Sequence, residues 1–303
     1  RGLKSFSVDA SNPSCSSRNG MLCTKDGNTL IVGVNGDVTI PTSVTSIGGR
    51  AFSYCSGLTS VRIHESVTNI NFGAFSDVII DDGSSAMKSF SVDASNPSYS
   101  SRNGLLCSKD GKTLISGVNG DVMIPEGVTN IGAGAFCCCV GLKSVIIPSS
   151  VTSIGNWAFK GCCGLTDVTI PSSVTSIGGW AFAGCNGLTS MAIPSNVTDV
   201  GHRAFSSCSN LTLLTISSGV TNIGDGAFSD CRGLTSVTIP SSVTNIGFFA
   251  FSDCSGLESV TIPSGMADRL GAFSRCRNLK SVGIEKDGKV EEIPSDELLA
   301  RQS

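Results

Sequence analysis

The sequence predicts an α/β solenoid, a right-handed stack of about twelve rungs, from two kinds of internal repetition. A 23-residue pattern, Leu-x-x-Val-x-Ile-Pro-x-x-Val-Thr-x-Ile-Gly-x-x-Ala-Phe-x-x-Cys-x-Gly, recurs most regularly between Leu142 and Gly256. A longer block, residues 3–41, returns at 87–125 with 7 of its 39 positions changed. Periods of this length are typical of stacked supersecondary units, each of which buries its apolar face against its neighbours.

One apolar column runs through nearly the whole chain. Its members are mostly 23 residues apart, with steps of 32, 29 and 32 around the duplicated block. We therefore expect one solenoid over 1–284, with irregular rungs near 3–41 and 87–125, regular repeats over 142–278, and a cap or tail at 285–303. The column consists of Val8, Ile40, Ile63, Val92, Ile124, Ile147, Ile170, Ile193, Ile216, Ile239, Ile262 and Ile284.

The apolar spacing within one rung predicts two strands and a turn. From Leu165 to Ile170 the residues alternate as in a strand with one buried face. Pro171 ends this first strand because proline cannot donate to a ladder. A shorter second strand is predicted over 174–177, and a single helical or 3₁₀ turn over 181–185. Stacking should pair the first strands of all rungs into one continuous parallel β-sheet.

The duplicated block carries an additional signal for a hairpin. Two apolar runs flank a Lys-Asp-Gly turn in residues 19–31 and again in 103–115. Asp-Gly between such runs is a strong hairpin signal, so we expect an extra hairpin on the side of the solenoid in each copy. Near the C-terminus, residues 296–299 could form a short helix that covers the last rung, as terminal caps do.

Composition excludes several classes of partner. Charged residues make up 15% of the chain, the formal net charge is −3 and the pI is about 5.4. Lysines and arginines are scattered, so no basic stripe for nucleic acid is present. No apolar run approaches the ~20 residues of a membrane span. The chain starts at Arg1, almost directly on a repeat, and we expect a fragment or processed form without its export signal or anchor.

The cysteines predict a ladder of buried thiols. Eight of the fourteen share one column, three residues after the repeat phenylalanine, and Val78 occupies that column in another rung. The position therefore favours a small apolar group rather than sulfur chemistry. Cys137, Cys138 and Cys163 lie outside the column and are the candidates for reaction or cross-linking. The column contains Cys55, Cys139, Cys162, Cys185, Cys208, Cys231, Cys254 and Cys276.

No pattern in the sequence indicates catalysis, a metal or a cofactor. His64 and His202 have no nucleophile or carboxylate constellation beside them in the sequence. The Asp-x-x-x-Asp fragments lack the ligand density of a calcium loop, and the glycines before Ala-Phe are turn residues of the repeat. We expect no catalytic, metal-binding or cofactor-binding residues and no cofactor.

Two outward-facing sets of residues are candidates for binding. The first consists of polar positions on the first strands, which form either a flat recognition surface or a solvated face with no partner. These are Ser144, Asp167, Thr169, Ser190, Leu213, Thr215, Ser236, Thr238, Ser259 and Thr261.

The second set is the column just before Ala-Phe. It contains the only two tryptophans, Trp157 and Trp180, on consecutive rungs, and Arg203 follows on the next rung. We expect the tryptophans to stack. The column is either a packing position that tolerates aromatic residues or an exposed aromatic–cationic platform for a protein or glycan.

The repeat core and the Asn-Pro-x-Tyr-Ser-Ser…Lys-Asp-Gly block at 96–111 resemble the BspA-like leucine-rich repeat family over about residues 3–284. His64 and Ser217 depart from the pattern where it has its strand-ending proline. The resemblance implies a leucine-rich-repeat-like fold in a cell-surface or secreted, extracellular protein. It also implies adhesion to a protein or glycan, such as host extracellular matrix or another cell surface.

Together these observations favour a non-enzymatic binding and adhesion repeat domain. The alternative is a structural spacer or stalk that presents another domain. A more distant alternative is a module associated with an enzyme whose catalytic domain lies elsewhere.

Overall fold

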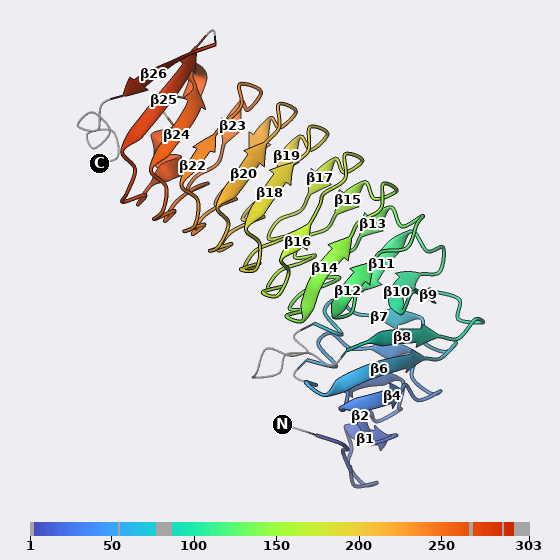
Figure 1. Cartoon of the computed structure of the whole chain (residues 1–303). Coiled ribbons are helices and arrows are strands. Elements are labelled where there is room, and N and C mark those ends of the chain that lie inside the picture. Colours follow the sequence, from blue (N-terminus) through green and yellow to red (C-terminus); the bar gives the residue numbers. More distant parts are fainter. Residues whose placement is uncertain (1–2, 54, 77–86, 267–268, 287, 294–303) are drawn as a thin grey trace.

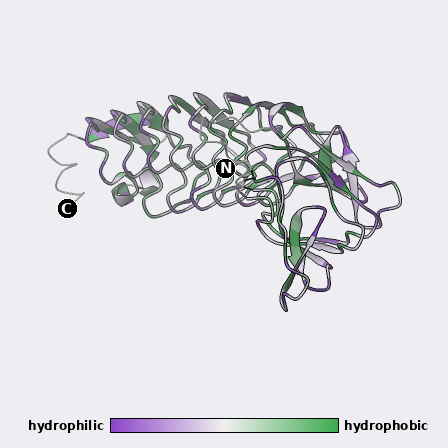
Figure 2. Ribbon diagram, turned by 90° about the horizontal axis from the view of Figure 1, so that it is seen from below, coloured by the Kyte–Doolittle hydropathy of each residue, from purple (hydrophilic) through white to green (hydrophobic). Residues whose placement is uncertain are grey.

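The computed structural model describes residues 3–53, 55–76, 87–266, 269–286 and 288–293. Its rungs follow one another from β1 at one end to β26 at the other, so that the molecule is an elongated stack (Figure 1). Figure 2 shows the same stack from below, with hydrophobic and hydrophilic residues in every part of it. Because the rungs follow one another as a stack, the predicted solenoid fold is confirmed.

First strands occur in eleven rungs of the described chain, one fewer than the twelve members of the apolar column. Val8, the first member, is in no strand. The first strands are β4 (Gly36–Thr39), β6 (Leu58–Ile63), β8 (Ser89–Val92), β12 (Gly120–Met123), β14 (Leu142–Ile146), β16 (Asp167–Val168), β18 (Ser190–Ile193), β20 (Leu213–Ile216), β22 (Ser236–Thr238), β24 (Ser259–Pro263) and β25 (Ser281–Lys286).

The prediction of one continuous sheet of first strands is wrong. In the described chain they divide into β4-β6-β8, β12-β14-β16, β18-β20 and β22-β24-β25-β26. Each first strand is short, and in most rungs a proline follows it that cannot donate to a ladder, so few hydrogen bonds hold neighbouring strands in register. One of the breaks follows β16, which with two residues is the shortest first strand.

The second strands form the longer parallel ladder. They pair without interruption from β11 (Thr113–Ser116) to β23 (Asn245–Ile246). A separate ladder, β3-β5-β7, belongs to the N-terminal rungs. The remaining members are β3 (Thr29–Val32), β5 (Ser46–Ile47), β7 (Asn69–Ile70), β13 (Asn130–Ile131), β15 (Ser153–Ile154), β17 (Ser176–Ile177), β19 (Asp199–Val200) and β21 (Asn222–Ile223).

Both predicted hairpins are present, and each is the second half of a three-stranded antiparallel meander. In the first copy β1 (Cys15–Arg18) pairs with β2 (Met21–Thr24), and β2 pairs with β3. In the second copy β9 (Tyr99–Arg102) and β10 (Leu105–Ser108) continue into β11 in the same way. Since β3 and β11 also pair in parallel with the next rung, the meanders extend the ladder of second strands at its edge.

The single turn predicted over 181–185 is present as a turn of the 3₁₀ type. The chain there makes hydrogen bonds from i to i−3, such as the bond of 3.2 Å from the Cys185 N–H to the Phe182 carbonyl. Trp180 (φ 59°), just before the turn, and Gly184 (φ 72°), within it, lie in the left-handed region and prevent a helix from continuing. In the described chain the only helices are two 3₁₀ helices, η1 (Ser264–Met266) and η2 (Leu270–Phe273).

The core is a stack of identical side chains. Seven phenylalanines, one from each rung between Phe136 and Phe273, lie with neighbouring ring centroids 4.9–5.3 Å apart and interplanar angles of 2–13°. All of them are buried. Offset stacking of this kind adds to the burial of apolar area, so the ladder joins the rungs energetically.

At the C-terminal end, β26 (Lys289–Ile293) pairs antiparallel with β25. This strand therefore covers the edge of the last first strand. The helix predicted at 296–299 lies outside the described residues.

Candidate functional site

The residue just before Ala-Phe lies in the left-handed region of backbone space in eight turns, with φ between 51° and 71°. Its N–H donates to the next rung, as from Trp180 to the His202 carbonyl at 2.8 Å and from Arg203 to the Asp225 carbonyl at 2.9 Å. The inter-rung bond fixes the backbone whichever side chain is present. The eight residues are Arg50, Gly73, Gly134, Trp157, Trp180, Arg203, Gly226 and Phe249.

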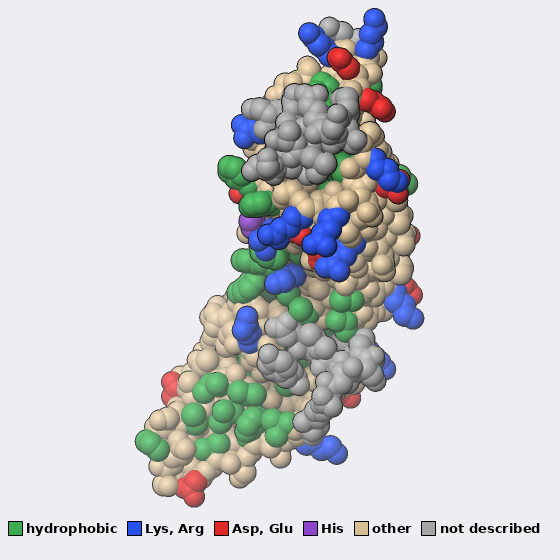
Figure 3. Space-filling model, turned by 90° about the vertical axis from the view of Figure 1, so that its left-hand side faces the viewer, with side chains coloured by type: hydrophobic (Ala, Val, Ile, Leu, Met, Phe, Trp, Pro, Cys, Tyr) green, Lys and Arg blue, Asp and Glu red, His purple; other side chains and the backbone are tan. Residues whose placement is uncertain are grey.

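Aromatic and cationic side chains meet on these turns, as the adjacent hydrophobic, basic and histidine side chains in Figure 3 illustrate. Arg203 Cζ lies 4.9 Å, and Lys160 Nζ 5.3 Å, from the centroid of the Trp180 ring. The His202 ring lies edge-on to Trp180 at 5.8 Å. We call the surface the turn ridge, and it consists of Phe72, Trp157, Lys160, Trp180, His202, Arg203, Phe248 and Phe249.

The predicted stacking of the two tryptophans is wrong. The Trp157 ring contacts Phe72 instead, with centroids 5.6 Å apart. Phe72 comes from an earlier rung and lies over Gly134, where a Cβ atom would stand 3.0 Å from the ring. The missing side chain at Gly134 therefore leaves the space in which Phe72 reaches Trp157. Trp180 lies between Lys160 and Arg203.

Much of the turn ridge is exposed. Phe248 is 74% exposed, Phe72 and Phe249 are each 59% exposed, and Trp157 is 36% exposed. Trp180 is half-buried. Phe72 and Phe248 were missed from the sequence because they stand one position before the column of the tryptophans. That neighbouring column also holds Asn156, His202 and Asp225. Its variation from rung to rung is the sequence feature that could have identified it as part of the exposed surface.

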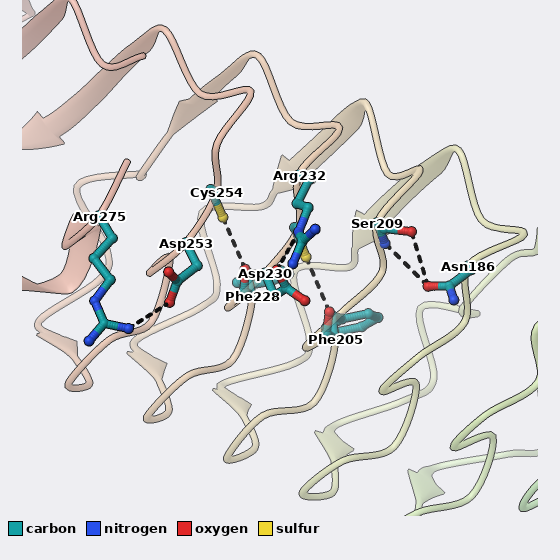
Figure 4. A network of polar contacts seen from close by, with 10 residues as sticks. Asn186, Phe205, Ser209, Phe228, Asp230, Arg232, Asp253, Cys254 and Arg275 are labelled. Carbon is teal, nitrogen blue, oxygen red and sulfur yellow. Dashed lines mark hydrogen bonds and ion pairs between the residues drawn. The ribbon is translucent and has the colours of Figure 1, made fainter. Parts of the chain in front are cut away.

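A groove of about 540 Å³ interrupts the turn ridge at Gly226. Asp225 accepts a hydrogen bond of 2.8 Å from the Phe248 N–H. Figure 4 shows Arg275 and Asp253 turned toward each other, and the Arg275 Nη1 to Asp253 Oδ2 distance is 3.7 Å. The groove is lined by turn residues of four successive rungs, among them Arg203, Asp225, Phe248, Phe249, Asp253 and Arg275.

The ten predicted strand-face residues are all exposed or half-buried. Three of them, Ser144, Asp167 and Thr169, line one shallow hollow of about 340 Å³. Two apolar residues that the sequence did not single out, Ile146 (59% exposed) and Met123 (60% exposed), lie opposite each other on β14 and β12.

The other members of this face are distributed along the ladders. Ser190 stands opposite Leu213, and Ser236 opposite Ser259. Since the strand-face residues lie on the first strands or directly after one of them, and the turn ridge lies on the turns around Ala-Phe, the two predicted sets form separate surfaces.

A family model described as the BspA type leucine-rich repeat region, in six copies, matches residues 35–91, 119–235 and 198–298. The chain belongs to the BspA type leucine-rich repeat family. No curated protein matches the sequence.

Solved structures agree with the fold of this BspA type chain. A leucine-rich repeat protein from Eubacterium ventriosum is 24% identical with a TM-score of 0.55, and the match covers 72% of this chain and 64% of that protein. The pneumococcal vaccine antigen PcpA is 19% identical with a TM-score of 0.57, covering 83% of this chain and 63% of PcpA. The chain thus spans less than two thirds of either protein, and the likeness concerns the fold.

The column cysteines of this BspA type repeat are free thiols, as predicted. Beyond filling space, six of them donate S–H to the carbonyl of a phenylalanine in the preceding rung, at 3.0–3.2 Å, and Figure 4 shows two of these bonds. Burial raises the pKa of the Cys231 thiol to about 12 and that of Cys55 to about 11. Of the three cysteines predicted as candidates for reaction, Cys163 is exposed, and the Sγ atoms of Cys137 and Cys138 are 3.8 Å apart.

The histidines of the BspA type chain have structural neighbours. His64 Nδ1 lies 3.1 Å from Asp93 Oδ2, and Arg62 pairs with the other oxygen of the same carboxylate at 3.0 Å. This cluster joins β6 to the start of the second duplicated block and includes no nucleophile. Within the described ranges, no group of three or more His, Cys, Asp or Glu side chains is arranged to hold a metal ion. The same residues contain no helix with the length and apolarity to span a bilayer.

Proposed function

We propose that this chain is a non-enzymatic recognition domain of a cell-surface or secreted protein, and that its turn ridge contacts a protein or glycan. One observation carries the proposal: bulky, exposed aromatic and cationic side chains occupy a left-handed backbone position. Glycine adopts that conformation without a steric penalty, and other residues incur about 1–2 kcal/mol each.

The chain itself supplies the comparison between glycine and larger residues. Three turns place Gly73, Gly134 and Gly226 at this position, with the same backbone conformation as Trp157 and Phe249. An exposed Phe249 contributes little to the core, so folding alone does not account for its presence. Tryptophan, other aromatic residues and arginine are the types that concentrate binding energy at interfaces.

The surface location is supported by the family and by the kind of protein that shares the fold. PcpA is described as a vaccine antigen. Adhesion to extracellular matrix or to another cell is the specific role that we propose for a domain of this kind, through the turn ridge or the strand face.

A spacer or stalk is the second candidate function. The elongated stack in Figure 1, in which the interactions holding the fold run between neighbouring rungs, is the observation that favours it. A stalk would hold another domain at a distance and would bind nothing through its own surface.

Screening the purified domain against extracellular-matrix proteins and a glycan array supplies a binding partner. Trp157→Ala combined with Trp180→Ala should then weaken binding by over 2 kcal/mol, as truncated interface hot spots do, while the fold is retained. The matched set on the strand face, Asp167→Lys with Ser190→Arg, tests the other surface by charge and bulk. If both variants bind the partner as well as the parent does, the proposal that these rungs recognise it is wrong, and the stalk becomes the favoured function.

A further inference from the structure

The groove at Gly226 has the position and size of a binding subsite within the turn ridge. In the left-handed column, Gly226 stands between Arg203 and Phe249 and has no side chain. The groove at this position has a volume of about 540 Å³. Small-ligand sites are typically about 300–1,000 Å³. Because the inter-rung hydrogen bond from the Gly226 N–H to the Phe248 carbonyl (2.9 Å) is kept, the groove has a rigid floor.

The chemistry of the groove is balanced between donors and acceptors. Arg203 and Arg275 present guanidinium groups, which only donate hydrogen bonds. Asp225 and Asp253 present carboxylates, which only accept them. Two positive groups therefore stand against two negative groups, and the exposed ring of Phe249 forms an apolar wall beside them.

We infer that this groove binds an uncharged sugar ring of a glycan. Sugar hydroxyls donate to carboxylates and accept from guanidinium groups, and the C–H face of the ring packs against an aromatic side chain. An anionic ligand would face Asp225 and Asp253, and a cationic one would face Arg203 and Arg275. This inference rests on the proposed function and narrows its ligand class at one position of the turn ridge.

A peptide partner fits the groove less well. Peptides that bind through their backbone add to an exposed strand edge. Here both backbone groups of Gly226 are already used, since the Gly226 N–H bonds to the Phe248 carbonyl and the Ser229 N–H to the Gly226 carbonyl at 3.0 Å. The carboxylates and guanidinium groups of the groove belong to side chains, which suits a ligand with many hydroxyl groups.

Filling the groove gives the direct test. Gly226→Trp places in it the residue that two other rungs carry at this position, and the φ of Gly226 (60°) matches that of Trp180 (59°). A Cβ there would stand 3.0 Å from Arg203 Cγ, so a flexible side chain has to move and the backbone does not. Gly184→Asn is the matched control: its φ is 72°, its nearest neighbouring atom is 3.8 Å from the new Cβ, and it does not line the groove.

The probe is a printed array of uncharged glucose-, galactose- and mannose-terminated oligosaccharides beside sialylated and sulfated ones. The parent should bind uncharged members, and titration in solution should show binding at least tenfold weaker for Gly226→Trp and within twofold for Gly184→Asn. Asp225→Asn with Asp253→Asn should also weaken binding at least tenfold. Asparagine keeps the acceptor for the Phe248 N–H, so this variant removes charge without removing that bond.

Three outcomes would overturn the inference. The parent binds no uncharged member of the array; Gly226→Trp binds such a member as well as the parent does; or the Asp225→Asn, Asp253→Asn variant gains affinity for anionic members. The protein could instead bind a protein partner, with binding abolished by Trp157→Ala combined with Trp180→Ala and unchanged by Gly226→Trp. That result would support the proposed function and refute the glycan subsite.

Discussion

Asn96 joins the second hairpin-bearing block to the rung before it. Its side chain is fully buried, and its Nδ2 donates to the carbonyls of His64 (2.6 Å) and Val67 (2.9 Å). Its Oδ1 accepts from the N–H groups of Ser98 (2.9 Å) and Tyr99 (2.8 Å). Asn96→Ala removes four hydrogen bonds of about 0.5–1.5 kcal/mol each, so the free energy of unfolding should fall by about 2–6 kcal/mol.

The first copy of the block contains a matched control at Asn12. Its Oδ1 accepts the same two turn bonds, from Ser14 at 2.9 Å and Cys15 at 3.0 Å, and its side chain is half-exposed. Asn12→Ala therefore removes only the bonds within the turn, where water can replace them. We expect a loss of about 1–3 kcal/mol, toward the lower end. The difference between the two variants measures the contact between rungs.

Urea unfolding of both variants, followed by circular dichroism, gives this difference. Hydrogen exchange should show that Asn96→Ala loosens residues 58–70 first, because a solenoid is coupled mainly between nearest neighbours. Equal losses for the two variants, or faster exchange at the C-terminal rungs than at 58–70, would refute the reasoning.

Three further predictions concern the core ladders. Phe182→Ala should lower the free energy of unfolding by roughly 3–5 kcal/mol, because the ring is buried between Phe159 and Phe205; exchange that rises uniformly over the chain would argue against coupling between neighbouring rungs. Thiol labelling of native protein should reach the exposed Cys163 first and few of the fourteen cysteines in all, whereas a native mass showing five or more disulfides would contradict the thiol ladder. Since burial raises the pKa of Cys231 to about 12, the folded state keeps a proton that the unfolded state loses above about pH 9; this one thiol should therefore contribute a fall in stability of about 1.4 kcal/mol per pH unit between pH 9 and 12, and Cys231→Ala should remove that contribution from the slope. An unchanged slope in Cys231→Ala would count against a buried, protonated thiol.

The repeated columns were predictable because identical side chains recur at a fixed spacing. The buried phenylalanine and cysteine columns follow from the position of Phe182 and Cys185 in the 23-residue pattern. Both hairpins followed from the Lys-Asp-Gly turns. The donation of six column S–H groups to a carbonyl of the preceding rung was not predictable, since it depends on how far one turn is displaced along the stack.

The turn ridge could be predicted only in part. The sequence identifies the column of Trp157 and Trp180, but it gives neither the left-handed φ of that position nor the different partners of the two rings. The contact between Phe72 and Trp157 also depends on Gly134, because the missing side chain of an intervening rung provides the space. The first strands are two to six residues long and divide into separate sheets, and the uniform repeat pattern distinguishes neither their lengths nor the positions of the breaks.

The central claim is that the left-handed column carries its large side chains for recognition rather than for folding. Trp157→Gly combined with Phe249→Gly tests it most directly, with unfolding and partner binding measured on the same protein. Glycine relieves the strain of the left-handed position at both sites, so stability should not fall by more than about 1 kcal/mol relative to the parent, while affinity for the partner found in the screen falls at least tenfold. A loss of several kcal/mol of stability together with unchanged affinity would contradict the account.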